Sequence, residues 1–66
     1  HMMAGLPDII GCYQGKFFGL EVKEPGGKAS TIQLHVQAQI RKAGGISDTI
    51  ITRFDAYKIL GIDDDE

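Results

Sequence analysis

Two carboxylates and a lysine stand at a spacing that suits chemistry on a phosphodiester. Asp8 follows Pro7, and Glu21 comes after twelve more residues, with Lys23 two positions beyond it. Side chains two positions apart on a strand point to the same face, so Glu21 and Lys23 are expected to lie together. Carboxylate oxygens are the ligands that a hard divalent cation prefers. The pattern therefore predicts a metal-dependent nuclease.

Each of these residues has an expected role. Asp8 and Glu21 are predicted to bind Mg²⁺ directly, together with a backbone carbonyl near Val22. Bound there, the cation would polarise the scissile phosphate and lower the pKa of a water. Lys23 would orient or help deprotonate that water, or neutralise charge in the transition state. The alternative is that Asp8 caps a turn and Glu21 pairs with Lys23 on an exposed strand face.

Length and composition limit what can hold these groups in place. The chain has 66 residues, of which 42% are hydrophobic, enough for one small α/β domain that is marginally stable alone. A single cysteine allows no internal disulfide, and Cys12, His1 and His35 fit no zinc pattern. A partner subunit is therefore expected. No apolar run approaches the ~20 residues that span a membrane, and no signal peptide is visible, which favours the cytoplasm.

The charge is unevenly distributed along the chain. The net charge is −2, but four of the nine acids form the segment 63–66. Residues 1–62 carry seven basic and five acidic residues, a net of +2. We expect a mildly basic domain over 3–62 and an acidic tail over 63–66, although that tail could equally be a solvated end. Residues 1–2 (His-Met) are interpreted as an expression scar.

The apolar pattern predicts a hairpin that carries the three residues. Residues 7–13 and 16–24 are typical of strands, joined by a turn at Gln14-Gly15. Gly19 is expected to leave room beside Glu21 for a metal or a phosphate backbone. The predicted core face of the second strand comprises Phe18, Leu20 and Val22. The opposite face comprises Phe17, Gly19, Glu21 and Lys23.

A helix and two further elements follow the hairpin. Ser30 and Gln33 form a capping box that opens a helix from Thr31 to Ala43, with Gly44 as its stop. A third strand is predicted over 48–53, and a short helix from Asp55, as its cap, to Leu60, with Gly61 after it. The helix-linked strands should be parallel. The predicted apolar stripe of the main helix comprises Ile32, Val36, Ile40 and Ala43. The polar stripe beside it comprises Gln33, Gln37 and Arg41.

These motifs together resemble the virus-type replication-repair nuclease (VRR-NUC) domain of the PD-(D/E)xK superfamily. The similar segments are Gly5–Ile10, Gly15–Lys23, Pro25–Lys28, Ser30–Gln33 and Lys42–Gly45. The resemblance implies a reduced restriction-endonuclease-like core: a mixed three-stranded sheet with one main helix and a short C-terminal helix. It implies Asp8 and Glu21 as metal ligands, Lys23 as the catalytic lysine, and Gln33 on a helix facing the site.

The resemblance also implies cofactors and partners. These are Mg²⁺ or Mn²⁺, DNA that is branched, and a homodimer as in stand-alone phage forms, which would act in the host cytoplasm. The family usually has a helix carrying another acid before this motif, whereas only His1 to Ala4 precede Gly5 here. Without that helix, apolar surface on one face of the sheet is expected to be exposed. A dimer, possibly domain-swapped, would bury it.

Several other side chains have two possible uses. Gln33 is explained either by the capping box or by a place beside the catalytic lysine, and the two are compatible. Cys12 is expected in the core rather than as a nucleophile, and His35 on the surface. Basic residues that could hold DNA phosphates, or be only solvated charges, are Lys28, Arg41, Lys42 and Arg53.

Three functions remain open on the sequence. The first is a structure-selective DNA endonuclease, comparable to a junction resolvase. The second, motivated by the missing helix, is a catalytically impaired form of the scaffold that binds DNA or oligomerises. The third is a structural module that uses its acidic face for a protein partner.

Overall fold

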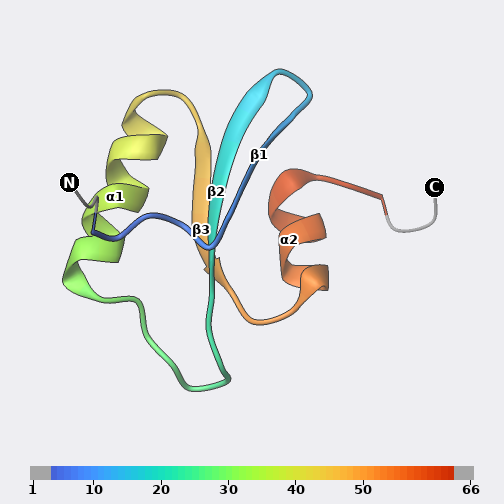
Figure 1. The fold of residues 1–66 in the computed structure, drawn as a ribbon. Helices are drawn as coiled ribbons and strands as arrows, with labels where there is room; N and C mark the ends of the chain where they lie inside the picture. Colours follow the sequence, from blue (N-terminus) through green and yellow to red (C-terminus); the bar gives the residue numbers. More distant parts are fainter. Residues whose placement is uncertain (1–3, 64–66) are drawn as a thin grey trace.

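The computed structural model describes residues 4–63 and has the predicted order of elements (Figure 1). The expectations for residues 1–2 and for 64–66 of the acidic tail lie outside this part. The elements are β1 (Ile9–Tyr13), β2 (Lys16–Val22), α1 (Thr31–Lys42), β3 (Ile46–Ile50) and α2 (Arg53–Leu60). A small α/β domain with a mixed three-stranded sheet and two helices is therefore confirmed.

The sheet has the order β1-β2-β3. β1 pairs antiparallel with β2, with Ile9 opposite Leu20, and β2 pairs parallel with β3, with Glu21 opposite Thr49. The β1–β2 turn contains Gln14 at φ 51° and Gly15 at φ 81°. Two consecutive left-handed residues match the twist of a tight hairpin, which explains why the turn falls there.

Several predicted boundaries were wrong by about two residues. β1 begins at Ile9 rather than at residue 7, and β2 ends at Val22 rather than at 24. β3 covers Ile46–Ile50 rather than 48–53. The shift in β3 arises because the chain turns at Thr52, which is the N-cap of α2.

The start of α2 corrects the predicted role of Asp55. Thr52 is the cap, and its side chain accepts a hydrogen bond from the Asp55 N–H. Asp55 lies three positions into the motif, where its Oδ2 accepts from the N–H groups of Ile51 (2.9 Å) and Thr52 (3.0 Å). This is a capping box, as at Ser30 and Gln33 of α1. Gly61, at φ 78°, ends the helix as expected.

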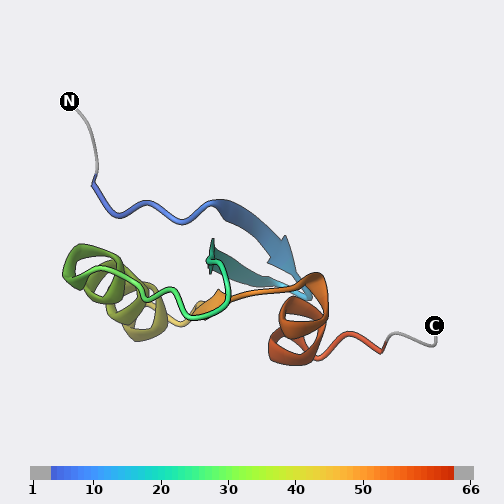
Figure 2. The ribbon, with the colours of Figure 1, turned by 90° about the horizontal axis from the view of Figure 1, so that it is seen from below.

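The two helices lie on opposite sides of the sheet, close to β3 (Figures 1 and 2). α1 packs against β3 and β2, and α2 packs against β3. Leu20 and Ile50 are the buried hydrophobic residues of the described chain. The predicted core face is therefore right for Leu20 but wrong for Val22, whose side chain is 43% exposed. None of the helices in residues 4–63 is long and apolar enough to cross a membrane.

Ile40 of the apolar stripe contacts β2, with its Cδ1 3.0 Å from the Cβ position of Gly19, but the buried residue of α1 comes from the polar stripe, contrary to expectation. Gln37, from the polar stripe, is the buried residue of α1, and its Nε2 donates to Thr49 Oγ1 at 2.9 Å. Arg41 Nε donates to the Ser47 carbonyl at 2.9 Å. Ile32, from the predicted buried stripe, is 52% exposed. The sheet face below α1 carries polar side chains, and buried polar groups need hydrogen-bond partners, so the polar stripe turns inward.

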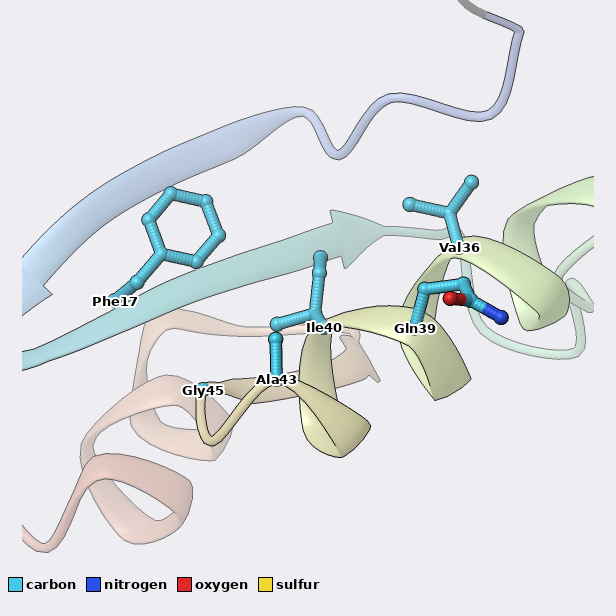
Figure 3. Close-up of a pocket in the computed structure, with 6 residues that line it drawn as sticks. All are labelled: Phe17, Val36, Gln39, Ile40, Ala43 and Gly45. Carbon is cyan, nitrogen blue, oxygen red and sulfur yellow. The ribbon is translucent and has the colours of Figure 1, made fainter.

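Three residues of the apolar stripe, Val36, Ile40 and Ala43, line an open groove of about 440 Å³ (Figure 3). Besides this stripe, Phe17 of β2 contributes to the groove wall. Nearby apolar side chains are also left in solvent, including Leu6 (58% exposed) and Ile10 (64% exposed). Apolar surface is therefore exposed in the described part of the chain. The groove is lined by Phe17, Val36, Gln39, Ile40, Ala43 and Gly45.

Candidate active site

The segment before β1 is held in place by two close approaches to glycine. Gly5 has φ 81°, and a Cβ there would lie 2.6 Å from Ile32 Cγ2 of α1. A Cβ on Gly19 would lie 2.7 Å from Pro7 Cγ. The space over Gly19 is therefore filled by Pro7, and the prediction that it leaves room for a metal or a phosphate was wrong. The absence of a side chain on Gly19 lets Pro7 pack against β2, and Asp8 follows Pro7 directly, just before β1 begins at Ile9.

Asp8 reaches across the hairpin to the end of β2. Its Oδ2 accepts a hydrogen bond from the Val22 N–H at 2.9 Å. Because Ile9 pairs with Leu20, continuation of the register brings Asp8 opposite Glu21. Asp8 therefore bonds between strands and does not cap a local turn, so that part of the alternative interpretation was wrong. The structure shows Val22 engaged through its N–H, while a metal bond from its carbonyl stays a prediction.

Glu21 is buried beneath the first turn of α1. It is 1% exposed, and its Oε1 accepts a hydrogen bond from Gln33 Nε2 at 2.9 Å. Its Oε2 is also buried and has no hydrogen-bond partner in the structure. An exposed ion pair with Lys23 was the alternative, and the burial of Glu21 contradicts it. A buried carboxylate oxygen without a partner is costly, so it marks a place where a cation would be stabilising.

The electrostatic environment of Glu21 disfavours its charged form. Burial raises the pKa of this carboxyl above its ordinary value, and the negative charge of Asp8 raises it further. The positive charge of Lys23 lowers the pKa of Glu21 and offsets part of this effect. A divalent cation bound beside Glu21 would favour its charged form and offset this effect.

Lys23 lies just past the end of β2, at the edge where the parallel strands finish. Its backbone N–H donates to the Ile50 carbonyl at 2.9 Å, which continues the pairing of β2 with β3 by one bond. The side chain is half-buried. The positive charge of its ammonium group lowers the pKa of Glu21. The structure thus brings Asp8, Glu21 and Lys23 to one end of the sheet.

Gln33 makes both of the contacts that the sequence left open. Its Oε1 accepts from the Ser30 N–H at 2.9 Å, and its own N–H donates to Ser30 Oγ at 3.1 Å. Its Nε2 meanwhile donates to Glu21. The side chain of Gln33 therefore takes part in the capping box of α1 and also orients the Glu21 carboxylate.

Three polar residues beside the site were not predicted as part of it. Thr49 pairs with Glu21 across the parallel strands and accepts from Gln37, as described above. Ser47, 3% exposed, donates from its Oγ to the Gly19 carbonyl at 2.6 Å. The available signal was their spacing, because Ser47 and Thr49 alternate along β3, and Gln37 is one helical turn beyond Gln33.

The predicted phosphate-binding residues divide between two ends of the domain. Lys28 lies in the loop after β2, and Arg53 starts α2 after β3, so both follow the strand ends that hold the site. The guanidinium carbon of Arg53 lies 5.1 Å from the centroid of the Phe54 ring. Arg41 and Lys42 lie in the last turn of α1, ~12 Å along the helix axis from Gln33. The structure does not bring all four together.

The remaining candidates lie outside the site. Cys12 is exposed, so its prediction as a core residue was wrong. The reason is that its face of β1 is uncovered. His35 is exposed on α1, as expected. Within residues 4–63, no three His, Cys, Asp or Glu residues converge to form a metal site. Asp8 and Glu21 would therefore be the side-chain ligands, a hard oxygen pair that suits Mg²⁺, which usually keeps several waters.

The raised pKa of Glu21 predicts how metal-free stability changes with pH. Because folding raises this pKa above 4.5, the folded state holds the proton more tightly than the unfolded state. Thermal stability should therefore fall as pH rises from about 4.5 through the folded-state pKa, and saturating Mg²⁺ should abolish the fall. Asp55 has a lowered pKa, so its contribution is lost only as pH falls through lower values. Melting curves from about pH 4.5 to 8 measure this.

Metal-free stability that stays flat or rises over that range would contradict the assignment. Replacement of Glu21 by Gln is the control, since an amide does not titrate and should remove the slope.

Searches of protein-family models, of the curated proteins and of the solved structures found no match to this chain.

Proposed function

We propose that this protein is a metal-dependent DNA endonuclease of the VRR-NUC type, using Mg²⁺ or Mn²⁺ and acting on branched DNA. One observation carries the proposal: the buried, unpartnered Glu21 Oε2 lies beside a second carboxylate, from Asp8, with Lys23 nearby. Buried carboxylate oxygens without a partner are uncommon in native structures, and a bound cation would satisfy this one. The similarity of the sequence motifs to that nuclease family supports the same interpretation.

Each residue of the candidate site would have a separate role in phosphodiester hydrolysis. Asp8 and Glu21 would hold the cation through one oxygen each, and Gln33 keeps the Glu21 carboxylate in one orientation through its 2.9 Å hydrogen bond. The cation, when bound, supplies Lewis-acid activation of the phosphate and of a water. Lys23 would orient the attacking water or stabilise charge on the phosphate oxygens. Lys28 and Arg53 would hold backbone phosphates at the same edge.

A second candidate follows from the donor set. Only two carboxylates of the described residues meet at the site, although the resembling family adds an acid from an earlier helix. A catalytically impaired protein that still binds DNA would have this composition. The two candidates differ in whether a bound divalent cation leads to strand cleavage.

A cleavage assay with a metal series tests the proposal. Linear, flap and four-way-junction DNA would be incubated with Mg²⁺, Mn²⁺ or a chelator. We expect metal-dependent cutting, preferentially of branched DNA, and a loss of at least roughly 100-fold in Asp8→Ala, because each metal ligand supports several kcal/mol of catalysis. Asp48→Ala is the matched control, since this acid is 52% exposed and away from the site, and it should cut like the parent.

The other outcomes separate the candidates. Salt-sensitive DNA binding without metal-dependent cutting would support the impaired form. Absence of DNA binding at low salt would leave the interaction module and overturn both DNA-based candidates. An Asp8→Ala variant that cuts as fast as the parent would overturn the site assignment. The proposal also includes a homodimer.

A further inference from the structure

Two glutamines of α1 hydrogen-bond to the sheet one helical turn apart. Gln33 Nε2 donates to Glu21 Oε1 of β2 at 2.9 Å. Gln37 Nε2 donates to Thr49 Oγ1 of β3, also at 2.9 Å. The two donors are four residues apart on one helix, which is about one turn. A shift of α1 relative to the sheet would therefore change both distances together.

The two acceptors are neighbours across the sheet. Glu21 is opposite Thr49 in the parallel pairing of β2 with β3, so both side chains lie on the face that α1 covers. Asp8 is opposite Glu21 on the other side, through the continued register of β1. Asp8, Glu21 and Thr49 therefore form one row across the three strands. The bond from Gln37 anchors α1 to the β3 end of the row that contains the candidate metal ligands.

Gln37 occupies the most enclosed position on α1. It is 2% exposed, and it is the buried residue of this helix. Among the described residues, the buried hydrophobic ones, Leu20 and Ile50, both come from strands. Apolar burial is non-directional, whereas a hydrogen bond enclosed away from water has a defined geometry and no solvent competitor. The Gln37–Thr49 bond is therefore the contact best able to define where α1 sits.

We propose that Gln37 is a positioning residue of the candidate metal site: its bond to Thr49 holds α1 where Gln33 reaches Glu21. Gln37 itself bonds to Thr49 and Arg41 and to neither carboxylate of the site. Its effect on the cation would pass through Gln33, and loss of a group that supports a metal ligand typically lowers metal affinity about 10–100-fold. The inference rests on the proposed metal site for its Mg²⁺ readout, but the position of Gln33 can be measured without metal.

A paired variant, Gln37→Met with Thr49→Val, separates positioning from simple burial. It removes donor and acceptor together, so neither is left buried without its partner, and its melting temperature should stay close to that of the parent. Mg²⁺ affinity, measured by titration calorimetry, should fall about tenfold. Gln39→Met is the matched control, because Gln39 is exposed on the same helix and should bind Mg²⁺ like the parent. Thr49→Ser keeps the hydroxyl and should also retain the affinity.

Nuclear magnetic resonance of the metal-free protein provides the second readout. The side-chain amide signals of Gln33 are identified by their loss in Gln33→Met. In the paired variant they should shift toward those of a solvent-exposed glutamine. In a Gln33→Met background, the same pair of substitutions should cause little further loss of Mg²⁺ affinity, because two residues that act through one contact are not additive.

Three outcomes would overturn the inference. They are a folded paired variant with the Mg²⁺ affinity of the parent, Gln33 amide signals that do not change in it, and a full further loss of affinity in the Gln33→Met background. If the paired variant does not fold, Thr49→Val alone is judged by the same two measurements. A parent that binds no Mg²⁺ would instead overturn the proposed metal site, and the metal-free amide signals would then decide the role of Gln37.

Discussion

Replacing Glu21 with Gln should abolish metal-dependent cleavage without destabilising the metal-free protein. The variant keeps an oxygen that can accept the hydrogen bond from Gln33 Nε2, now 2.9 Å from Oε1. It removes a negative charge from a buried position beside Asp8, where burial raises the pKa of Glu21. Cleavage should fall by at least roughly 100-fold, because a cation that supplies several kcal/mol of stabilisation loses a ligand.

Stability measurements provide a second readout that does not depend on DNA. At about pH 8 the metal-free variant should melt at the same temperature as the parent or higher, because the penalty of an ionised buried carboxylate is gone. Mg²⁺ should raise the melting temperature of the parent through preferential binding to the folded state, and should have little effect on the variant. Calorimetry with and without Mg²⁺ measures both.

Asp48→Asn is the matched control for loss of one acid. Asp48 is half-exposed and contacts Arg41 at 4.0 Å, an exposed ion pair that contributes little. It should retain cleavage and the Mg²⁺ response. A Glu21→Gln variant that is still stabilised by Mg²⁺ like the parent would show that the cation binds elsewhere. A metal-free variant that is strongly destabilised would show that the Glu21 carboxylate has a structural role.

The local signals in the sequence were sufficient to place most of the elements. Ser30 and Gln33 mark the start of α1, and Gly61 marks the end of α2, because capping depends on short-range hydrogen bonds and on φ. The register of β3 was misplaced because Ile50 and Ile51 are both apolar. The decisive interaction there, Thr52 with Asp55, is a capping box whose last residue is Asp instead of the usual Glu or Gln.

The sequence predicted the part of the candidate site that depends on side-chain alternation along a strand. It did not predict the part that depends on how α1 packs on the sheet. Glu21 and Lys23 share a face by their spacing alone. Which residues of α1 are buried depends on what the sheet presents. Thr49 accepts a hydrogen bond from the buried Gln37, and the Ser47 carbonyl accepts one from Arg41, whose side chain is 50% exposed. Helical periodicity identifies both stripes but does not rank them when the facing surface is polar. Tertiary hydrogen bonding decided the orientation.

Gly19→Ala should disturb the metal site through the segment that carries Asp8. The added methyl group would lie 2.7 Å from Pro7 Cγ and 3.0 Å from Ile40 Cδ1, so Pro7 must move. Overpacking of this kind costs about 1–3 kcal/mol, a large share of the roughly 3–10 kcal/mol expected for a domain of 66 residues. Because Asp8 follows Pro7 directly, we expect Mg²⁺ affinity to fall about tenfold or more, as when groups that support metal ligands are lost. Titration calorimetry with Mg²⁺ and denaturant melts measure the two effects.

Gly15→Ala is the control that separates a loss of folding stability from a displacement of Asp8. Gly15 has φ 81° and nothing within 4 Å of its Cβ position, so alanine there costs left-handed strain, about 1–2 kcal/mol, far from Asp8. Both variants should therefore be less stable, but only Gly19→Ala should bind Mg²⁺ more weakly under conditions where it is folded. Equal Mg²⁺ affinities would mean that Asp8 reaches its position through its bond to the Val22 N–H alone. A weaker affinity confined to Gly19→Ala would show that Pro7, seated on a glycine, sets the geometry of the carboxylate pair.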